Sequence, residues 1–579
     1  MVPVLGNGKY EVVWPRGQTV AGVIPCAERL DTLEGKTICE LSNQIFRANE
    51  IFPILEKELA KLYPGIKFVS YDVFDVPHGK ETGKKTEIVM ALPDVLKQLK
   101  CDAVISGVVG GGSSAPATVR VSIAAEEQGF PSASIICDGF VTLSHFTAAG
   151  SGMPNLPISA YPGHVDTHSA EELQKNVETV LVSQVIKSLT VQPEEARPHR
   201  EPASGDIVFK GTFEEVNRFF YEREWSDGLP IVPPTTEKVE EFLKYTDRSP
   251  DDVIGILPPD KREATVWNIA VNGVMAGCRP EYMPVLVALV EAMAEPKFGQ
   301  EYFGHAPGTE VFITLNGTII KELGFNYEQG ALRVGFQANT SVGRFWRLYL
   351  RNVAGFLPRK TDVTPFGGTW RVVLAENEAA VAKIGWEPMS VDQGFKAGDN
   401  IVTITSCTST DSVFSFSTAK TEEVLDRIAA RIVDIQLFLF KSSFLGPGVR
   451  PQIILAPSIA EKIAKGGYSK SKVKQYLCEH AVFTARRYEQ LSSNTFDIGS
   501  LFDAGKKGKL PEQYCQSEDP DRLLPIVFSP DDFLITVSGD FGKDNCFICA
   551  QNGFIGYPVS KKIELPARWE NLLKEAKTG

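Results

Sequence analysis

A run of three glycines and two serines, Gly110–Ser114, stands between a hydrophobic segment and a segment with helical spacing. Glycine lets the backbone approach a ligand closely, and serine can cap a helix start. A helix start also offers free N–H groups and the positive end of its dipole to an anion. We therefore predict that Gly111, Gly112, Ser113 and Ser114 contact an anionic substrate, with Ser114 as a candidate nucleophile. An ordinary capped strand-to-helix turn is the alternative, and the run matches neither GxGxxG nor a Walker motif.

A cysteine in a predicted helix corner is the second candidate. Gly277–Pro280 (GCRP) is expected to end one helix at Gly277 and to begin the next at Pro280. We expect Arg279 to lower the pKa of Cys278, which would make Cys278 a thiolate and a catalytic residue. A buried thiol that fills the corner is the competing interpretation.

Three polar residues of the same region are predicted to bind substrate. They are Asn272, Asn339 and Arg344. The planar guanidinium of Arg344 suits a carboxylate or phosphate. A salt bridge from Arg344 to an internal acid is equally compatible with the sequence.

Two histidines with H-x3-H spacing, His164 and His168, suggest a metal pair only if they lie on a helix. Pro162 and Gly163 precede them and favour a loop, so a zinc site is not predicted. We predict instead that His164 is a general base near the glycine–serine run, with His145 as a competitor.

Cysteine spacing elsewhere gives no clear metal or redox site. Cys546 and Cys549 form a C-x2-C pair, but a turn-like sequence follows them, and Cys478-Glu479-His480 has unusual spacing for zinc. We predict no metal and no cofactor, and two hydrophobic strand residues at 546 and 549. Ten cysteines in 579 residues, mostly scattered singly, indicate free thiols in a reducing cytoplasm.

The elements that must position these residues alternate between strand and helix in the first 190 residues. Strands are predicted at Lys36–Leu41, Ile66–Val73, Cys101–Val109 and Ser132–Cys137, and helices at Asn49–Leu62, Glu87–Leu99, Thr118–Gln128 and Ala170–Ser188. This order predicts an α/β fold with a doubly wound, flavodoxin-like parallel sheet over 1–190. Residues 191–210 are rich in proline and charge and are predicted to be a linker. Residues 211–579 are predicted to form a larger mixed α/β domain.

The sequence over roughly residues 20–190 resembles the UGSC-type proteins, some of which are selenoproteins. The stretches that carry the resemblance are Arg29–Lys36 (RLDTLEGK), Asp102–Gly107 (DAVISG) and Glu127–Pro131 (EQGFP). The family carries Sec/Cys-Gly-Ser-Cys where this chain has Gly111–Ser114. Both the Sec/Cys and the final Cys are therefore replaced, and the resemblance implies no thiol or selenol chemistry at this loop.

The later sequence resembles the companion segment often found beside that motif. The matching stretches are Asp227–Thr235 (DGLPIVPPT), Asn272–Pro284 (NGVMAGCRPEYMP), Asn339–Arg344 (NTSVGR) and Asn352–Gly355 (NVAG). This resemblance implies a UGSC-like unit fused to its companion, and it implies no particular reaction.

Composition excludes several classes of function. The net charge is −12 and the charged fraction is 23%, which disfavours a nucleic-acid or anionic-membrane binder. No secretory signal or transmembrane segment is evident, so we expect a cytoplasmic protein, and we expect it to form a homodimer.

The leading hypothesis is an enzyme that acts on a small anionic organic substrate in a cleft between the two domains. With the redox residues replaced, a lyase, hydrolase or isomerase is favoured. A thiol-dependent oxidoreductase using Cys278 or the Cys546/Cys549 pair is one alternative. A small-ligand binding protein without catalysis is the other.

Overall fold

Five parallel strands form the centre of the N-terminal unit, which we define as residues 30–190. In sheet order they are β3 (Lys67–Val69), β2 (Thr37–Leu41), β4 (Ala103–Val109), β5 (Ser132–Cys137) and β6 (Ile158–Tyr161). This order reverses direction between β2 and β4, which is the flavodoxin-like arrangement. The predicted doubly wound sheet is confirmed. The computed structural model describes residues 8–42, 46–74, 92–195, 200–305, 308–368, 372–414, 419–444, 448–492, 500–508, 510–553 and 556–578.

Helices cover both faces of this sheet, which explains why β4 is buried along its whole length. One face carries α1 (Ala48–Leu62), α5 (Ala170–Asn176) and α6 (Val182–Thr190). The other face carries α3 (Ser114–Glu126), α4 (Val141–Gly150) and the helical residues 92–98. The first part of the predicted helix Glu87–Leu99 lies outside the described residues. Helix α3 begins four residues earlier than predicted, directly after the glycines.

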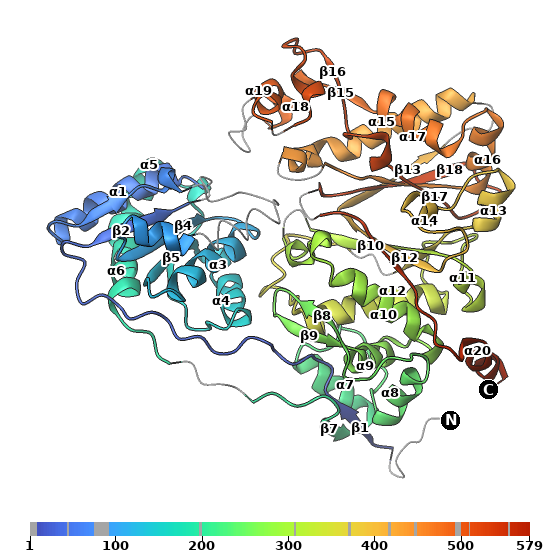
Figure 1. Cartoon of the computed structure of the whole chain (residues 1–579), viewed down its shortest axis with the longest axis horizontal. Coiled ribbons are helices and arrows are strands. Elements are labelled where there is room, and N and C mark those ends of the chain that lie inside the picture. The colour runs from blue at the N-terminus through green and yellow to red at the C-terminus, as the bar shows by residue number, and fades with distance from the viewer. Residues whose placement is uncertain are drawn as a thin grey trace.

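The first strand of the chain lies in the other half of the molecule. Strand β1 (Tyr10–Val13) pairs antiparallel with β7 (Ile207–Gly211), and Val12 and Val13 are fully buried in the core of the C-terminal unit. We define that unit as residues 207–578 together with β1. Figure 1 shows the two connecting segments running side by side between the units. The predicted domain boundaries at residues 190 and 210 remain a prediction. The pairing of β1 with β7 shows in addition that residues 10–13 pack with the C-terminal unit.

An ionic network fixes both connecting segments on the hairpin of β8 (Val253–Leu257) and β9 (Arg262–Thr265). The guanidinium of Arg262 donates to both carboxylate oxygens of Glu201, at 2.7 and 2.8 Å, and to Asp260 at 2.6 Å. Arg16 also pairs with Asp260. Arg16 follows β1 and Glu201 precedes β7, so one network anchors the outgoing and the returning chain.

Two stacked sheets form the C-terminal unit. One sheet contains β11 (Val373–Ala375), β10 (Glu310–Asn316), β12 (Ile401–Cys407) and β19 (Val559–Lys562), in that order. The other contains β13 (Ser409–Phe414), β18 (Asn545–Ala550), β14 (Gln452–Leu455) and β17 (Leu534–Val537). Phe312 and Leu374 of the first sheet share a buried cluster with Ile454 and Cys549 of the second. The predicted mixed α/β character of this part is confirmed.

Helices pack on the outer face of each sheet, so the unit has four layers (Figure 1). The helices over the first sheet are α9 (Val266–Ala276), α10 (Met283–Met293) and α12 (Gln337–Tyr349). Those over the second are α15 (Thr421–Gln436), α16 (Pro457–Lys465) and α17 (Lys470–His480). Shorter or peripheral elements are α7 (Phe213–Glu222), α8 (Thr236–Leu243), α11 (Ile319–Glu322), α13 (Glu378–Lys383), α14 (Met389–Asp392), α18 (Ala485–Ser492), α19 (Leu501–Lys506), α20 (Trp569–Thr578), β15 (Val482–Thr484) and β16 (Leu523–Pro525).

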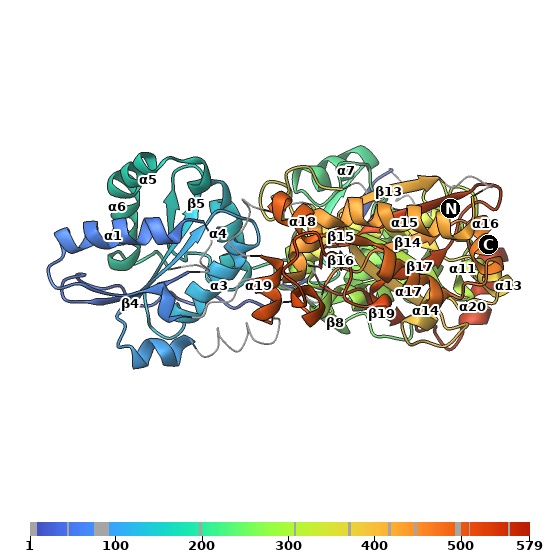
Figure 2. The same ribbon diagram turned by 90° about the horizontal axis from the view of Figure 1, so that it is seen from above.

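The two units lie side by side, and α3 and α4 of the N-terminal unit face the C-terminal unit (Figures 1 and 2). Arg120 on α3 pairs with Glu301. A Cβ at Gly150, the last residue of α4, would lie 2.6 Å from the carbonyl oxygen of Pro259. Among the described residues, helices are too short or too polar to cross a bilayer.

One cysteine pair corrects the expectation that the thiols are all free. Cys39 on β2 and Cys101 just before β4 form a disulfide with their Cα atoms 5.9 Å apart. The two residues lie far apart in the sequence, and adjacent parallel strands bring them together. Eight other cysteines are free.

Candidate functional site

The glycine–serine loop follows β4 at the carboxyl edge of the N-terminal sheet, where α3 begins. Ser113 is the N-cap residue, but its side chain makes no capping hydrogen bond, and the Ser114 hydroxyl donates to the carbonyl of Gly111 at 2.8 Å. The predicted serine cap is therefore not formed. Within the described part of the chain, the amides of Gly112 and Ser113 have no hydrogen-bond acceptor. These amides and the helix dipole are the features that hold an anion at a helix start.

Glycine is required at positions 110 and 111 because of a neighbouring aromatic ring. A Cβ at Gly110 would lie 2.7 Å from the ring of Phe46, and a Cβ at Gly111 would lie 2.9 Å from the same ring. Phe46 follows β2, so the loops after β2 and β4 meet where the sheet order reverses. That reversal is where open α/β sheets bind their ligands.

His164 holds this loop in place. Its Nε2 lies 2.7 Å from the carbonyl oxygen of Gly110, and its Nδ1 accepts a hydrogen bond from the amide of Asp166 at 3.2 Å. The acceptor role of Nδ1 places the proton on Nε2. Both ring nitrogens are thus engaged, which favours a positioning role over the predicted general base. The Ser114 hydroxyl points to Gly111 and makes no hydrogen bond to His164.

His168 belongs to a different set of contacts. Its Nδ1 lies 2.9 Å from the hydroxyl of Tyr161 and 3.3 Å from the amide nitrogen of Asn176. The two histidines of the H-x3-H pair therefore have separate partners. In the described ranges, no cluster of three His, Cys, Asp or Glu side chains has a geometry suited to a metal ion.

A histidine from the C-terminal unit packs directly against the loop. A Cβ at Gly112 would lie 3.0 Å from Cδ2 of His305 and 3.1 Å from a methyl carbon of Val363. The His305 side chain is 4% exposed, and its Nδ1 has no partner among the described residues. Burial lowers the pKa of His305 to about 4, so its imidazole is neutral near pH 7.

Charged groups surround this contact. Arg120 of α3 pairs with Glu301, and burial together with Glu301 raises the pKa of the adjacent Tyr302. Lys261, in the β8–β9 turn, also approaches Arg120 and Glu301, and burial lowers its pKa. Several titratable groups with shifted pKa values at one interface are typical of a functional site.

Cys278 does not have the properties of a thiolate. It follows the αL residue Gly277, which ends α9 as predicted. Burial raises the pKa of Cys278 to about 12, against the smaller opposing influence of Ser341 and Arg344. Arg279 pairs instead with Glu281. The expectation that Arg279 lowers the pKa of Cys278 is therefore wrong, because the thiol lies in the core of the C-terminal unit.

Internal partners occupy the three polar residues predicted to bind substrate. Arg344 donates to both carboxylate oxygens of Asp227, at 2.9 and 3.1 Å, and to the carbonyl of Pro230 at 2.8 Å. The side-chain amide of Asn272 donates to the carbonyls of Pro15 and Asn268. The side chain of Asn339 bridges both backbone groups of Asn326 and donates to the carbonyl of Val373. The contact between Arg344 and Asp227 joins two stretches of the sequence, Asp227–Thr235 and Asn339–Arg344.

The C-x2-C pair lies on β18 with its two side chains in different environments. Cys546 belongs to the core beneath the outer helices, whereas Cys549 lies between the two sheets beside Cys407. Burial raises the pKa of Cys546 to about 12 and that of Cys549 far above its usual range. Cys478 and His480 lie on α17, where His480 pairs with Asp426 at 3.0 Å. His145 lies on α4, where burial lowers its pKa.

A buried carboxyl group of β2 lies next to a half-buried carboxyl group of α1. Glu40 on β2 is 1% exposed and interacts with Glu56 of α1. Burial raises the pKa of Glu40 to about 9, and the neighbouring carboxyls of Glu56 and Asp72 add to this effect. Glu40 is therefore protonated near neutral pH.

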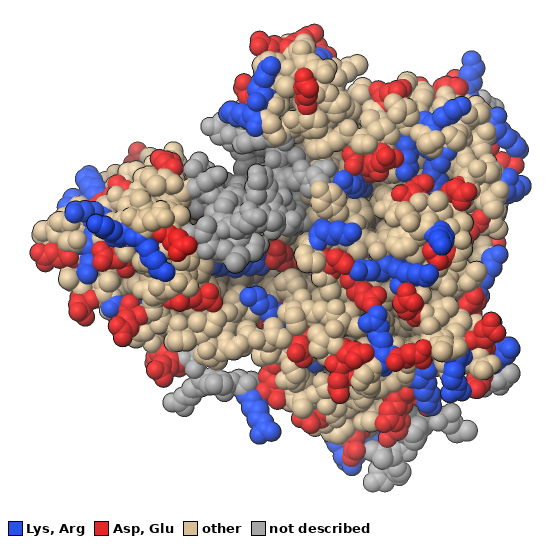
Figure 3. Space-filling model, viewed as in Figure 1, with Lys and Arg blue, Asp and Glu red and all other residues tan. Residues whose placement is uncertain are grey.

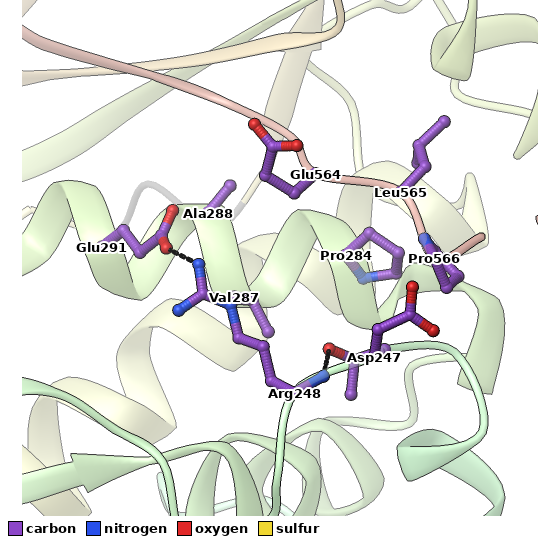
Figure 4. Close-up of a pocket in the computed structure, with 10 residues that line it drawn as sticks. Asp247, Arg248, Pro284, Val287, Ala288, Glu291, Glu564, Leu565 and Pro566 are labelled. Atoms are coloured by element: carbon purple, nitrogen blue, oxygen red, sulfur yellow. Dashed lines mark hydrogen bonds and ion pairs between the residues drawn. The ribbon is translucent and has the colours of Figure 1, made fainter.

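A separate pocket of about 210 Å³ lies on the C-terminal unit (Figure 4). Arg248 and Glu291 pair within it, and Glu564–Pro566 close one side. None of the residues predicted from the sequence lines this pocket. Lys and Arg side chains are interspersed with Asp and Glu over the molecular face in Figure 3.

Sequence reasoning missed His305 and Arg120. His305 stands in a glycine- and proline-rich stretch, Phe303–Gly308 (FGHAPG), which resembles in composition the loops that were singled out. That composition was the available signal. Its contact with Gly112 depends on how the two units meet, which no local pattern encodes.

Comparison with known proteins supports one assignment. The curated proteins contain no relative that matches this chain. Residues 11–191 match the model of the UGSC family, which confirms the predicted family for the N-terminal segment of the chain.

Proposed function

We propose that this protein is an enzyme that acts on a small anionic organic substrate, held where the loop Gly111–Ser114 meets His305 of the C-terminal unit. The observation that carries the proposal is the contact of Gly112 with the ring of a buried, neutral histidine. The loop supplies the amides of Gly112 and Ser113, which have no acceptor among the described residues, and His305 supplies a group able to transfer a proton. A reacting atom between them would have both an anion site and an acid–base residue.

Non-redox chemistry fits this arrangement best, so we propose a lyase, hydrolase or isomerase. By the resemblance to UGSC-type proteins, Gly111 and Ser114 stand where those proteins carry Sec or Cys. The thiol of Cys278 is buried and its pKa is about 12, so at neutral pH it is almost entirely the weakly nucleophilic thiol. Cys546 and Cys549 belong to different clusters and cannot act as a vicinal dithiol. These observations disfavour the thiol-dependent oxidoreductase.

A small-ligand binding protein without catalysis is the second candidate. The engagement of both nitrogens of His164 and of the polar groups of Asn272 and Arg344 favours it. In that case His305 contacts the ligand without transferring a proton to it. A measurement of turnover distinguishes the enzyme from the binding protein, because both would bind a ligand at the loop.

A thermal-shift screen tests the proposed site. Small carboxylates and phosphates are screened for an increase in the Tm of the wild-type protein. Gly112→Val places a side chain against His305 and Val363, and we expect this variant to fold but to lose the increase. Gly22→Val is the matched control, because a Cβ at Gly22 would meet no atom within 4 Å. A Gly112→Val variant that folds and responds like the wild type would remove the loop from the site.

The cytoplasmic location and the homodimer that the sequence suggests are kept as proposals. Cell fractionation tests the first, and sedimentation equilibrium tests the second. A homodimer requires a mass of twice 63.5 kDa.

A further inference from the structure

We propose that His305 takes up a proton from solvent when an anion binds at the first turn of α3, and that it then holds the anion as an imidazolium. This inference rests on the proposed function and adds to it that binding is coupled to one proton. The proposed ligands are small oxyanions. Carboxylates, sulfonates and phosphates would all be recognised by hydrogen bonds to their negatively charged oxygens.

The ring of His305 lies beside Gly112, and the amides of Gly112 and Ser113 have no acceptor among the described residues. Cγ and Cδ2 of the ring lie 3.2 and 3.0 Å from the position of a Cβ at Gly112. The carbonyl of His305 accepts from the amide of Gly308 at 2.8 Å, which fixes the backbone that carries the ring. Nδ1 is buried without a partner among the described residues, and such a polar atom is costly unless a ligand completes its hydrogen bond.

The charges around His305 nearly cancel in the unliganded protein. Glu301 and Tyr302 precede it in the chain, and the ring of Tyr302 lies edge-on at 5.9 Å. Arg120 faces it from α3, and Asp362 stands beside Val363 on the opposing segment. Glu301 raises the pKa of His305 and Arg120 lowers it, but these two residues form an ion pair. Burial is therefore left as the dominant influence and keeps the ring neutral.

A bound anion supplies the negative charge that the neutral ring lacks. One proton leaves the solvent and forms an N–H bond on the imidazole, and no other bond changes. The imidazolium and the amides of Gly112 and Ser113 then donate to the same oxyanion. Above the pKa of about 4 of the free protein, this linkage makes the anion bind about tenfold more weakly for each unit rise in pH, until the pKa of the complex is passed.

Calorimetry with anions that keep their charge tests the inference. Sulfate and methanesulfonate are titrated at pH 6 in two buffers that differ in ionisation enthalpy, which gives the number of protons taken up. We expect about one proton per bound anion in the wild type and in the control His480→Gln, whose histidine pairs with Asp426 in the outer layer. We expect no uptake in His305→Gln.

A second measurement needs no variant. The chain has seven histidines, so selective ¹⁵N labelling resolves their side chains by NMR. Sulfate must move one ring from neutral to imidazolium shifts. Binding without proton uptake, uptake that persists in a folded His305→Gln, or absence of binding by both anions would overturn the inference. The carboxylate and phosphate screen with Gly112→Val tests the proposed function separately, so the two failures are distinguishable.

Discussion

Nε2 of His164 lies 2.7 Å from the carbonyl oxygen of Gly110, so a side chain from the loop after β6 fixes the backbone of the loop after β4. The ring of Phe46 packs against the same glycine from the loop after β2. Two loops at one sheet edge thus hold the turn that leads into α3. These contacts restrain the loop without a ligand, which reduces the entropy cost of binding.

This relationship predicts the effect of removing His164. His164→Ala loses one hydrogen bond to the loop, worth about 1–1.5 kcal/mol, so sulfate should bind about tenfold more weakly. The pH dependence of binding should stay as in the wild type, because we propose that the proton taken up on binding goes to His305. Isothermal calorimetry between pH 5 and 8 measures both quantities. A changed pH dependence with unchanged affinity would instead make His164 the titrating group.

Replacement of Cys278 should affect stability and little else. The side chain is 9% exposed in the core of the C-terminal unit, so Cys278→Ala should lower the free energy of unfolding by about 1–2 kcal/mol. Ligand binding and any turnover should persist. Urea unfolding measures the cost, and Cys26→Ala, at a half-buried thiol, should change it by less than about 0.5 kcal/mol. Loss of turnover in a stable Cys278→Ala protein would restore the thiol hypothesis.

The disulfide between Cys39 and Cys101 predicts the number of free thiols that can be titrated in the protein. Denatured, unreduced protein should titrate eight thiols with a chromogenic disulfide reagent. Reduction before denaturation should add the two thiols of Cys39 and Cys101 and raise the count to ten. Cys39→Ser should leave nine cysteines, all of them free. Ten reactive thiols without reductant would show that the bond does not form in the purified protein.

The buried carboxyl of Glu40 predicts a pH-dependent stability. Its pKa is about 9 in the folded protein and near 4.3 in an unfolded chain, so the folded state binds more protons between these values. The contribution of Glu40 to stability is therefore full below about pH 4.3 and is lost as pH rises toward 9. Glu40→Gln should unfold at higher urea concentration than the wild type at pH 8–9, with a flatter pH dependence. Glu34→Gln, at an exposed carboxyl, is the control and should leave the profile unchanged.

Strand β1 should stabilise a unit that lies far from it in sequence. Val12 is fully buried among residues of the C-terminal unit, so Val12→Ala should cost about 2 kcal/mol. Hydrogen exchange should become faster in Ile207–Gly211, the partner strand. Val20→Ala, at a side chain 44% exposed, should change neither quantity. Faster exchange confined to the N-terminal sheet would contradict this placement.

The predicted bounds of an element are accurate where the hydrophobic pattern and the residues that mark its ends agree. Strand Ser132–Cys137 has the predicted bounds, because Pro131 marks its start and Cys137 ends its apolar run. Short strands such as Ile158–Tyr161 carry too few residues to show a period, so they are not predictable from the sequence. Strand Ile66–Val73 was predicted too long, since a 3₁₀ turn begins at Tyr71.

The candidate site was predictable only in part. The run of glycines predicts the loop, and the order of strands and helices places this loop at the edge of the sheet. An arginine at position 344 could bind either an external anion or an internal carboxylate. The contact with Asp227 is visible only in the folded structure. His305 and the Cys39–Cys101 bond depend on contacts between segments far apart in sequence, which residue spacing does not specify.

The pairing of β1 with β7 has a consequence for the order in which the chain is made. Tyr10–Val13 leave the ribosome first, but their partner strand emerges only after the whole N-terminal sheet. The core of that sheet draws on residues between Leu33 and Leu189, so all of these residues are synthesised before Ile207 and the sheet can fold first. When β1 finally closes on β7, it joins the two ends of a folded body, and the entropy cost is far below that of closing a random coil of the same length. Strand β1 is thus synthesised before the N-terminal unit but forms its strand pair only after β7 has been synthesised.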